Sequence, residues 1–122
     1  ITDDDSLSGM EKLRKFVRYQ MKVVHEKGPV MNLYMAESRH LSKASKDKYL
    51  QSQRQYVRSF LKIIQQIRKE NPECWKEIDD AIVAYAILGM CNWPINWYSK
   101  DGKLSHEEIA EQFYRIIVES LC

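Results

Sequence analysis

The chain has 122 residues, of which 19 are basic, 17 are acidic and 44% are hydrophobic, and its net charge is +2. This composition excludes a disordered chain and is typical of one soluble domain that buries its own core. The longest uncharged apolar run, residues 81–91, is too short to cross a bilayer, so we expect no transmembrane helix.

The chain begins at Ile1 without a charged segment followed by an apolar one, so we expect no secretory signal and a fragment that lacks its true N-terminus. Its cysteines, Cys74, Cys91 and Cys122, are widely spaced and form no C-x-x-C pair. This spacing predicts neither a zinc site nor a thioredoxin-like centre. We expect reduced thiols and a cytoplasmic protein.

Hydrophobic residues recur at intervals of three and four, which predicts an all-α fold without strands. The first helix is expected to begin at Ser8, in a capping box with Glu11, and to end at Gly28-Pro29. A shorter second helix covers residues 30–40. After a polar connection, a third helix covers residues 47–70 and ends before Pro72.

The fourth expected helix covers residues 78–98. Its uncharged centre predicts a helix that is buried on all sides, with one face against another subunit. Pro94 is expected to cause a kink or an early stop at Trp93. Ser105 and Glu108 form a second capping box, which opens a last helix to about residue 121. We therefore expect five or six helices.

Charge is unevenly distributed, because residues 38–69 carry nine basic groups against Asp47 alone. Arg54, Arg58 and Lys62 are spaced by four and share one stripe of the third expected helix. Such a stripe is either a solvated face or a site for phosphate groups, which guanidinium forks bind well.

The sequence contains few motifs that would indicate a metal site or catalysis. Glu37 and His40 lie one helical turn apart, as in di-metal bundles, but the motif occurs once, so we expect no metal. His25 and His106 are expected to be surface or capping residues. No nucleophile motif and no glycine-rich loop occurs, so we expect neither an enzyme nor a cofactor.

Polar residues interrupt several apolar stripes. Buried polar groups need hydrogen-bond partners, so these residues either pair within a filled core or line a mostly apolar pocket. The interrupting residues are Gln20, Ser38, Gln53 and Asn92, and Tyr34, Tyr49 and Tyr56 bring hydroxyl groups to the same region.

Residues 88–98, Leu-Gly-Met-Cys-Asn-Trp-Pro-Ile-Asn-Trp-Tyr, and residues 101–108, Asp-Gly-Lys-Leu-Ser-His-Glu-Glu, resemble the C-terminal regulatory domain of TetR-family transcriptional repressors. The resemblance is specific over residues 81–121 and is looser over residues 8–70. It is closest to the branch that senses acyl-CoA thioesters. Pro94 departs from the family's pattern.

The resemblance implies that residues 1–122 form a ligand-binding and dimerisation domain, whose helix-turn-helix DNA-binding domain precedes this chain and is absent from it. The last two helices of two subunits would form a four-helix bundle. A hydrophobic effector, such as an acyl-CoA, would shift the first helix and release operator DNA, which only the missing domain would bind. We expect no membrane partner.

Three sets of site residues follow. The ligand is expected at Gln20, Met31, Tyr34, Met35, Ser38, Gln53, Tyr56, Phe60, Leu88 and Asn92. Its phosphates are expected at Arg54, Arg58 and Lys62. The dimer interface is expected at Ala86, Met90, Trp93, Trp97, Phe113, Ile116, Ile117 and Ser120. The alternatives are a neutral aromatic or cationic drug-like ligand, a helical interaction module with a filled core, and a ferritin-like metal bundle.

Overall fold

The computed structural model describes residues 4–37 and 42–121, and it describes side chains for residues 4–28 and 42–119. The described residues form four α-helices and one 3-10 helix, without strands, so the all-α prediction is confirmed and the expected count of five or six helices is not. The elements are α1 (Gly9–Glu37), α2 (Lys43–Glu70), α3 (Asp80–Asn92), η2 (Trp93–Asn96) and α4 (His106–Leu121).

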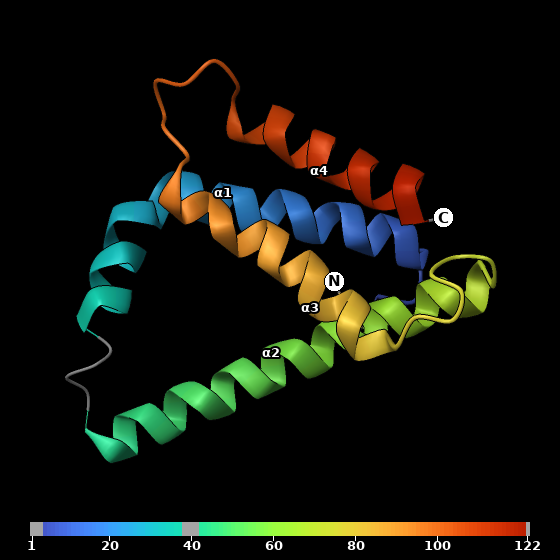
Figure 1. Ribbon diagram of the computed structural model, residues 1–122, viewed down its shortest axis with the longest axis horizontal. Helices are drawn as coiled ribbons and strands as arrows, with labels where there is room; N and C mark the ends of the chain where they lie inside the picture. The colour runs from blue at the N-terminus through green and yellow to red at the C-terminus, as the bar shows by residue number, and fades with distance from the viewer. Residues whose placement is uncertain (1–3, 38–41, 122) are drawn as a thin grey trace.

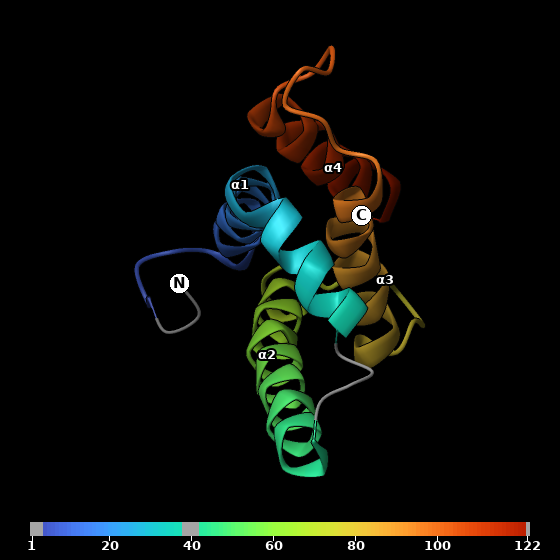
Figure 2. The same cartoon turned by 90° about the vertical axis from the view of Figure 1, so that its left-hand side faces the viewer.

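The helices pack around α1. In Figure 1, α4 runs along one side of α1, while α3 and then α2 lie on the other side. Figure 2 shows α1 and α3 side by side, with α2 below them and α4 above. The N-terminal half of α2 extends beyond the other helices, and its side chains are largely exposed.

The predicted break at Gly28-Pro29 is wrong, because α1 continues through both residues to Glu37. The two helices expected over residues 8–40 are therefore one helix. Pro29 cannot donate a hydrogen bond to the carbonyl group of His25, and a proline inside a helix bends the helix when it does not end it. The last turns of α1 bend away from its first half accordingly (Figure 1).

The other helix ends follow local capping. Helix α2 begins four residues earlier than expected, because Ser42 accepts a hydrogen bond from the backbone N–H of Ser45 at 3.2 Å. Helix α3 begins after Asp79, whose carboxylate accepts from the N–H of Ala81 at 2.8 Å. The predicted early stop at Trp93 is confirmed, since α3 ends at Asn92 and Pro94 lies in the first turn of η2.

Both predicted capping boxes contribute hydrogen bonds. The N–H of Glu108 donates to Ser105 Oγ at 3.1 Å, and the N–H of Ser105 donates to Glu108 Oε1 at 3.3 Å. At the start of α1, the N–H of Glu11 donates to Ser8 Oγ at 3.1 Å. These bonds satisfy amides that a helix N-terminus leaves without partners.

The core is formed by one stripe from each helix and by the loop that joins α2 to α3. Arg68 of α2 holds this loop, since it donates to the carbonyl oxygen of Trp75 and pairs with Asp80. The largest fully buried side chains include Trp75, Phe60, Leu13, Met21, Ile63, Ile64, Ile67, Ile87 and Ile117. The expectation that the fourth helix is buried on all sides is wrong, because one stripe of α3 is exposed.

Helices α1 and α2 approach closely at Gly9. A Cβ atom on Gly9 would lie 2.6 Å from Ile67 Cγ1 and 2.8 Å from the Ile67 backbone nitrogen. The N–H of Gly9 donates to Glu70 at 2.8 Å, and Gln66 donates to the same carboxylate at 2.9 Å. The hydrogen bond from Gln66, followed by that from Gly9, lowers the pKa of Glu70.

We expect Gly9→Ala to lower the free energy of unfolding by about 1–3 kcal/mol, because the added methyl group must push α1 away from the α2 backbone. Chemical denaturation followed by circular dichroism measures this change. Gly89→Ala is the matched control, since a Cβ atom there meets nothing within 4 Å and alanine favours the helix. Equal stability of the Gly9→Ala protein and wild type would contradict the close approach.

Candidate functional site

A groove of about 570 Å³ lies between α2 and α3. The two helices meet near the start of α3 and diverge toward its end, and the last turns of α1 lie across the open side of the pair (Figures 1 and 2). The groove is lined from α2 by Leu50, Gln53, Arg54, Val57, Arg58 and Leu61, and from α3 by Tyr85, Leu88, Gly89 and Asn92.

The groove combines an apolar base with a cationic side. Leu88 is 5% exposed, and Val57 and Leu61 are partly buried against the core. Arg54 and Arg58 are exposed, and no acidic residue lines the groove among the residues that the structure describes. The two arginines also border a smaller hollow of about 370 Å³ on α2, with Gln51 and Gln55. The arrangement suits a molecule with both an apolar and an anionic part.

The groove brings together five of the residues expected at the site from sequence, namely Gln53, Arg54, Arg58, Leu88 and Asn92. Lys62 is exposed on α2 but lines neither hollow among the residues described for them. Two residues of the basic stripe, Arg54 and Arg58, therefore lie beside an apolar surface, and Lys62 is not among the residues of that surface.

Gln20, Tyr56 and Phe60, which were expected to bind the ligand, are not among the residues that line this groove. They lie where α2 packs against α1. The side chain of Gln20 donates to the Tyr56 hydroxyl group, and Phe16 packs on both Tyr56 and Phe60, with ring centroids 5.7 and 4.5 Å apart. Burial raises the pKa of Tyr56 well above its ordinary value. These residues satisfy one another in a filled core.

The remaining candidate ligand residues, Met31, Tyr34, Met35 and Ser38, lie outside the residues whose side chains the structure describes, as do Glu37 and His40. Sequence reasoning missed Leu50, Val57 and Leu61, which line the groove. Their spacing of seven and four residues continues the basic stripe along the same side of α2, and this signal was available in the sequence.

A second surface feature is an apolar face on α3, η2 and α4, which we name the α3–α4 face. Its exposed large side chains are Ile78, Ile82, Tyr85, Trp93, Trp97 and Ile116. The ring of Trp97 meets the edge of Phe113 at 6.4 Å, which joins the end of η2 to α4. Exposed apolar side chains that gather on one face mark a candidate interface.

The candidate interface residues divide between this face and the core. Trp93, Trp97, Ala86 and Ile116 are exposed, and Met90 and Phe113 are partly buried. Ile117 is only 1% exposed and packs inside the chain, so it does not form part of the α3–α4 face. Helix α4 therefore buries Ile117 and exposes its neighbour Ile116, which is 51% exposed. Ser120 lies outside the residues whose side chains are described.

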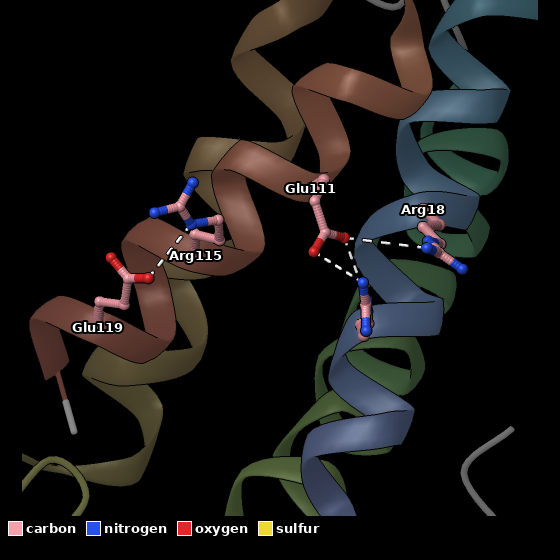
Figure 3. A network of polar contacts seen from close by, with 5 residues as sticks. Arg18, Glu111, Arg115 and Glu119 are labelled. Carbon is pink, nitrogen blue, oxygen red and sulfur yellow. Dashed lines mark hydrogen bonds and ion pairs between the residues drawn. The ribbon is translucent and has the colours of Figure 1, made fainter.

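Figure 3 shows the polar contacts that join α4 to α1. Arg14 donates to both carboxylate oxygens of Glu111, at 2.7 and 3.1 Å, and Arg18 lies 3.9 Å from the same group. The Arg14 guanidinium group also lies over the ring of Tyr114, at 5.4 Å. These side chains are exposed, so their main effect is to fix how α4 aligns on α1.

The cysteines differ from the expectation of reduced thiols. Cys91 is a free, fully buried thiol on α3, and burial raises its pKa to about 12. Cys74 is disulfide-bonded, so the expectation is wrong for that residue.

We expect Cys91 in the folded protein to resist a thiol reagent at pH 8. Burial keeps the reagent away from the sulfur, and the raised pKa keeps the thiol protonated and therefore unreactive. Peptide mapping by mass spectrometry after a short pulse of iodoacetamide measures the modified fraction. The same pulse in denaturant is the control and should label Cys91 fully. Rapid labelling of the native protein would show that α3 opens.

Among the described residues, no group of three potential metal ligands comes together. No helix among them is long and apolar enough to cross a membrane.

The sequence was compared with known proteins. Neither the curated proteins nor the solved structures yield a match. A family model described as "Tetracyclin repressor-like, C-terminal domain" matches residues 6–121, which is nearly the whole chain. The chain therefore belongs to the family of tetracycline repressor-like C-terminal domains.

Proposed function

We propose that this domain senses the effector of a TetR-family transcriptional repressor, and that the effector is an anionic amphiphile, most specifically an acyl-CoA. The observation that carries the proposal is the α2–α3 groove, in which Arg54 and Arg58 lie beside the apolar surface of Val57, Leu61 and Leu88. Family membership supports the regulatory role.

The chemistry of the groove supports an acyl-CoA. Its volume of about 570 Å³ lies in the usual range for small-molecule sites, and an acyl chain would cover the apolar base. The amides of Gln53 and Asn92, on opposite sides of the groove, would bond the thioester and pantetheine portions. Each guanidinium–phosphate contact would contribute about 1.5–3 kcal/mol when well paired.

A neutral or cationic ligand would leave both arginines unused, or oppose them, so the charge of the groove disfavours these alternatives. A helical interaction module without a ligand remains the other class of function. The filled core around Gln20 and Tyr56 is compatible with an interaction module. Such a module does not explain an open groove with a cationic side.

The proposal includes a homodimer through the α3–α4 face and a signal through α1. The last turns of α1 run past the diverging ends of α2 and α3 (Figure 2), so binding in the groove between these two helices would move them. Because the resemblance puts the DNA-binding domain before α1, movement of α1 would change the separation of two such domains and release operator DNA in the cytoplasm.

Calorimetric titration of the chain with dodecanoyl-CoA, free coenzyme A and dodecanoate tests the ligand class. We expect dodecanoyl-CoA to bind at least tenfold more tightly than either part alone, because only the thioester uses both the apolar base and the arginines. Tighter binding of a neutral aromatic compound would contradict the acyl-CoA assignment. Absence of binding by all of them, with no thermal stabilisation, would favour the interaction module.

A further inference from the structure

Two histidines stack at the junction of α1 and α4. The ring centroids of His25 and His106 lie 4.4 Å apart with an angle of 27° between the planes. His25 Nδ1 lies 2.6 Å from the hydroxyl group of Tyr98, which follows η2, and the edge of the Tyr98 ring faces His25 at 5.8 Å. Both histidines were expected to be surface or capping residues, but the structure joins three segments through them.

The two rings differ in how well they accommodate a proton. Tyr98 can donate to a neutral His25 or accept from a protonated one, and burial raises the pKa of its hydroxyl group, so that group stays protonated near neutral pH. His106 Nδ1 is buried and has no hydrogen-bond partner, so a proton there would find no acceptor. His106 is also the first residue of α4, where the helix dipole disfavours a cation.

The groups that face the pair do not offset a second charge. From α4, Glu107 lies 3.6 Å from His106 Nε2, but its side chain is 83% exposed and its attraction is screened by water. From the segment after η2, the facing group is Tyr98, which is neutral. From α1, the facing group is His25 itself. Two imidazolium rings in this stack would therefore repel each other.

We propose that the stacked His25–His106 pair is an acid-sensitive latch between α1 and α4, stable with one proton or none and opened by the second. Imidazole groups take up protons between about pH 8 and 5, so the latch responds to mild acid. The second junction of these helices, the ion pair between Arg14 and Glu111, contains no imidazole group. Acid would therefore release the N-terminal end of α4 first.

Release at this end would move the segment that carries Trp97 and Tyr98, and hence part of the α3–α4 face. The inference does not require the proposed ligand, because it rests on contacts between α1, α4 and the segment after η2. It predicts that acid changes the α1–α4 junction whether or not the groove is occupied.

The test compares thermal unfolding at pH 7.5 and pH 5.5, at one protein concentration, for wild type, His106→Phe and His40→Gln. Phenylalanine keeps a stacked ring that cannot be charged, and His40→Gln removes the chain's third histidine. We expect acid to lower the midpoint of wild type and His40→Gln by roughly 5 °C more than that of His106→Phe. An equal acid shift in wild type and His106→Phe would overturn the latch.

Proton NMR of the histidine rings gives a second readout in the folded wild-type protein. We expect the contact between the His25 and His106 rings to be present at pH 7.5 and lost at pH 5.5, together with the native Trp97 environment. If His106→Phe does not fold, the wild-type titration and the His25→Asn variant, which also lacks the paired charge, decide the question. Retention of the ring contact and of the Trp97 environment at pH 5.5 would contradict the proposal.

Discussion

Replacing Ile82 with aspartate is expected to convert a dimer of this domain into monomers without unfolding it. Ile82 is 59% exposed in the single chain, so the folded monomer tolerates a charge at that position. In a dimer through the α3–α4 face, the carboxylate would be buried against apolar groups, at a cost of several kcal/mol. Sedimentation velocity at micromolar concentration measures the change, and circular dichroism checks the fold.

Two variants separate an interface effect from a folding effect. Tyr19→Asp places the same charge at a similarly exposed position on α1, outside the α3–α4 face, and should leave the dimer intact. Ile117→Asp buries the charge inside the chain and should unfold it. A wild-type chain that sediments as a monomer, or an Ile82→Asp protein that remains dimeric, would contradict this interface.

Local signals predicted most helix ends. The capping box of Ser105 and Glu108 marks the start of α4, and Pro94 follows the end of α3, as predicted. Both signals are local, because a cap and a missing N–H donor act within one turn of helix. Pro29 shows the limit of this reasoning. A proline costs one backbone hydrogen bond, but α1 continues through Pro29 to Glu37, so this local signal alone does not decide where a helix ends.

Sequence spacing singled out some residues of the groove and not others, because one side of α2 meets α1 and a neighbouring side lines the groove. Charge spacing identified Arg54 and Arg58, and apolar spacing identified Leu88. Hydrophobic periodicity predicts that a residue is buried, but it does not predict which helix packs against it. Tyr56 and Phe60 therefore looked equivalent to Val57 and Leu61, although the first two meet α1 and the last two meet the groove.

A similar ambiguity affected α3. An uncharged helix is compatible with burial inside one chain or with burial between two chains, because both remove its surface from water. The structure shows which stripe of α3 the chain itself leaves exposed, with Ile82 its most exposed large side chain at 59%. Amino-acid composition alone does not show which stripe of α3 is exposed.

Removing the cationic side of the groove is expected to weaken acyl-CoA binding by about 10- to 100-fold for each arginine, which corresponds to the usual 1.5–3 kcal/mol of a charge-assisted hydrogen bond. Arg54→Ala and Arg58→Ala should leave stability nearly unchanged, because both side chains are exposed. Calorimetric titration with dodecanoyl-CoA in low and high salt measures the loss and its screening.

Lys62→Ala is the matched control for these two variants. It removes one positive charge from the same basic stripe, one turn beyond Arg58, but from a position that does not line the groove. A general attraction of the basic stripe for anions would lower affinity equally in all three variants and would disappear in high salt. Direct phosphate contacts would instead lower affinity mainly in the arginine variants and would leave dodecanoate binding unaffected. Equal affinity of wild type and the double arginine variant would make the stripe a solvated face and would remove the main support for an anionic effector.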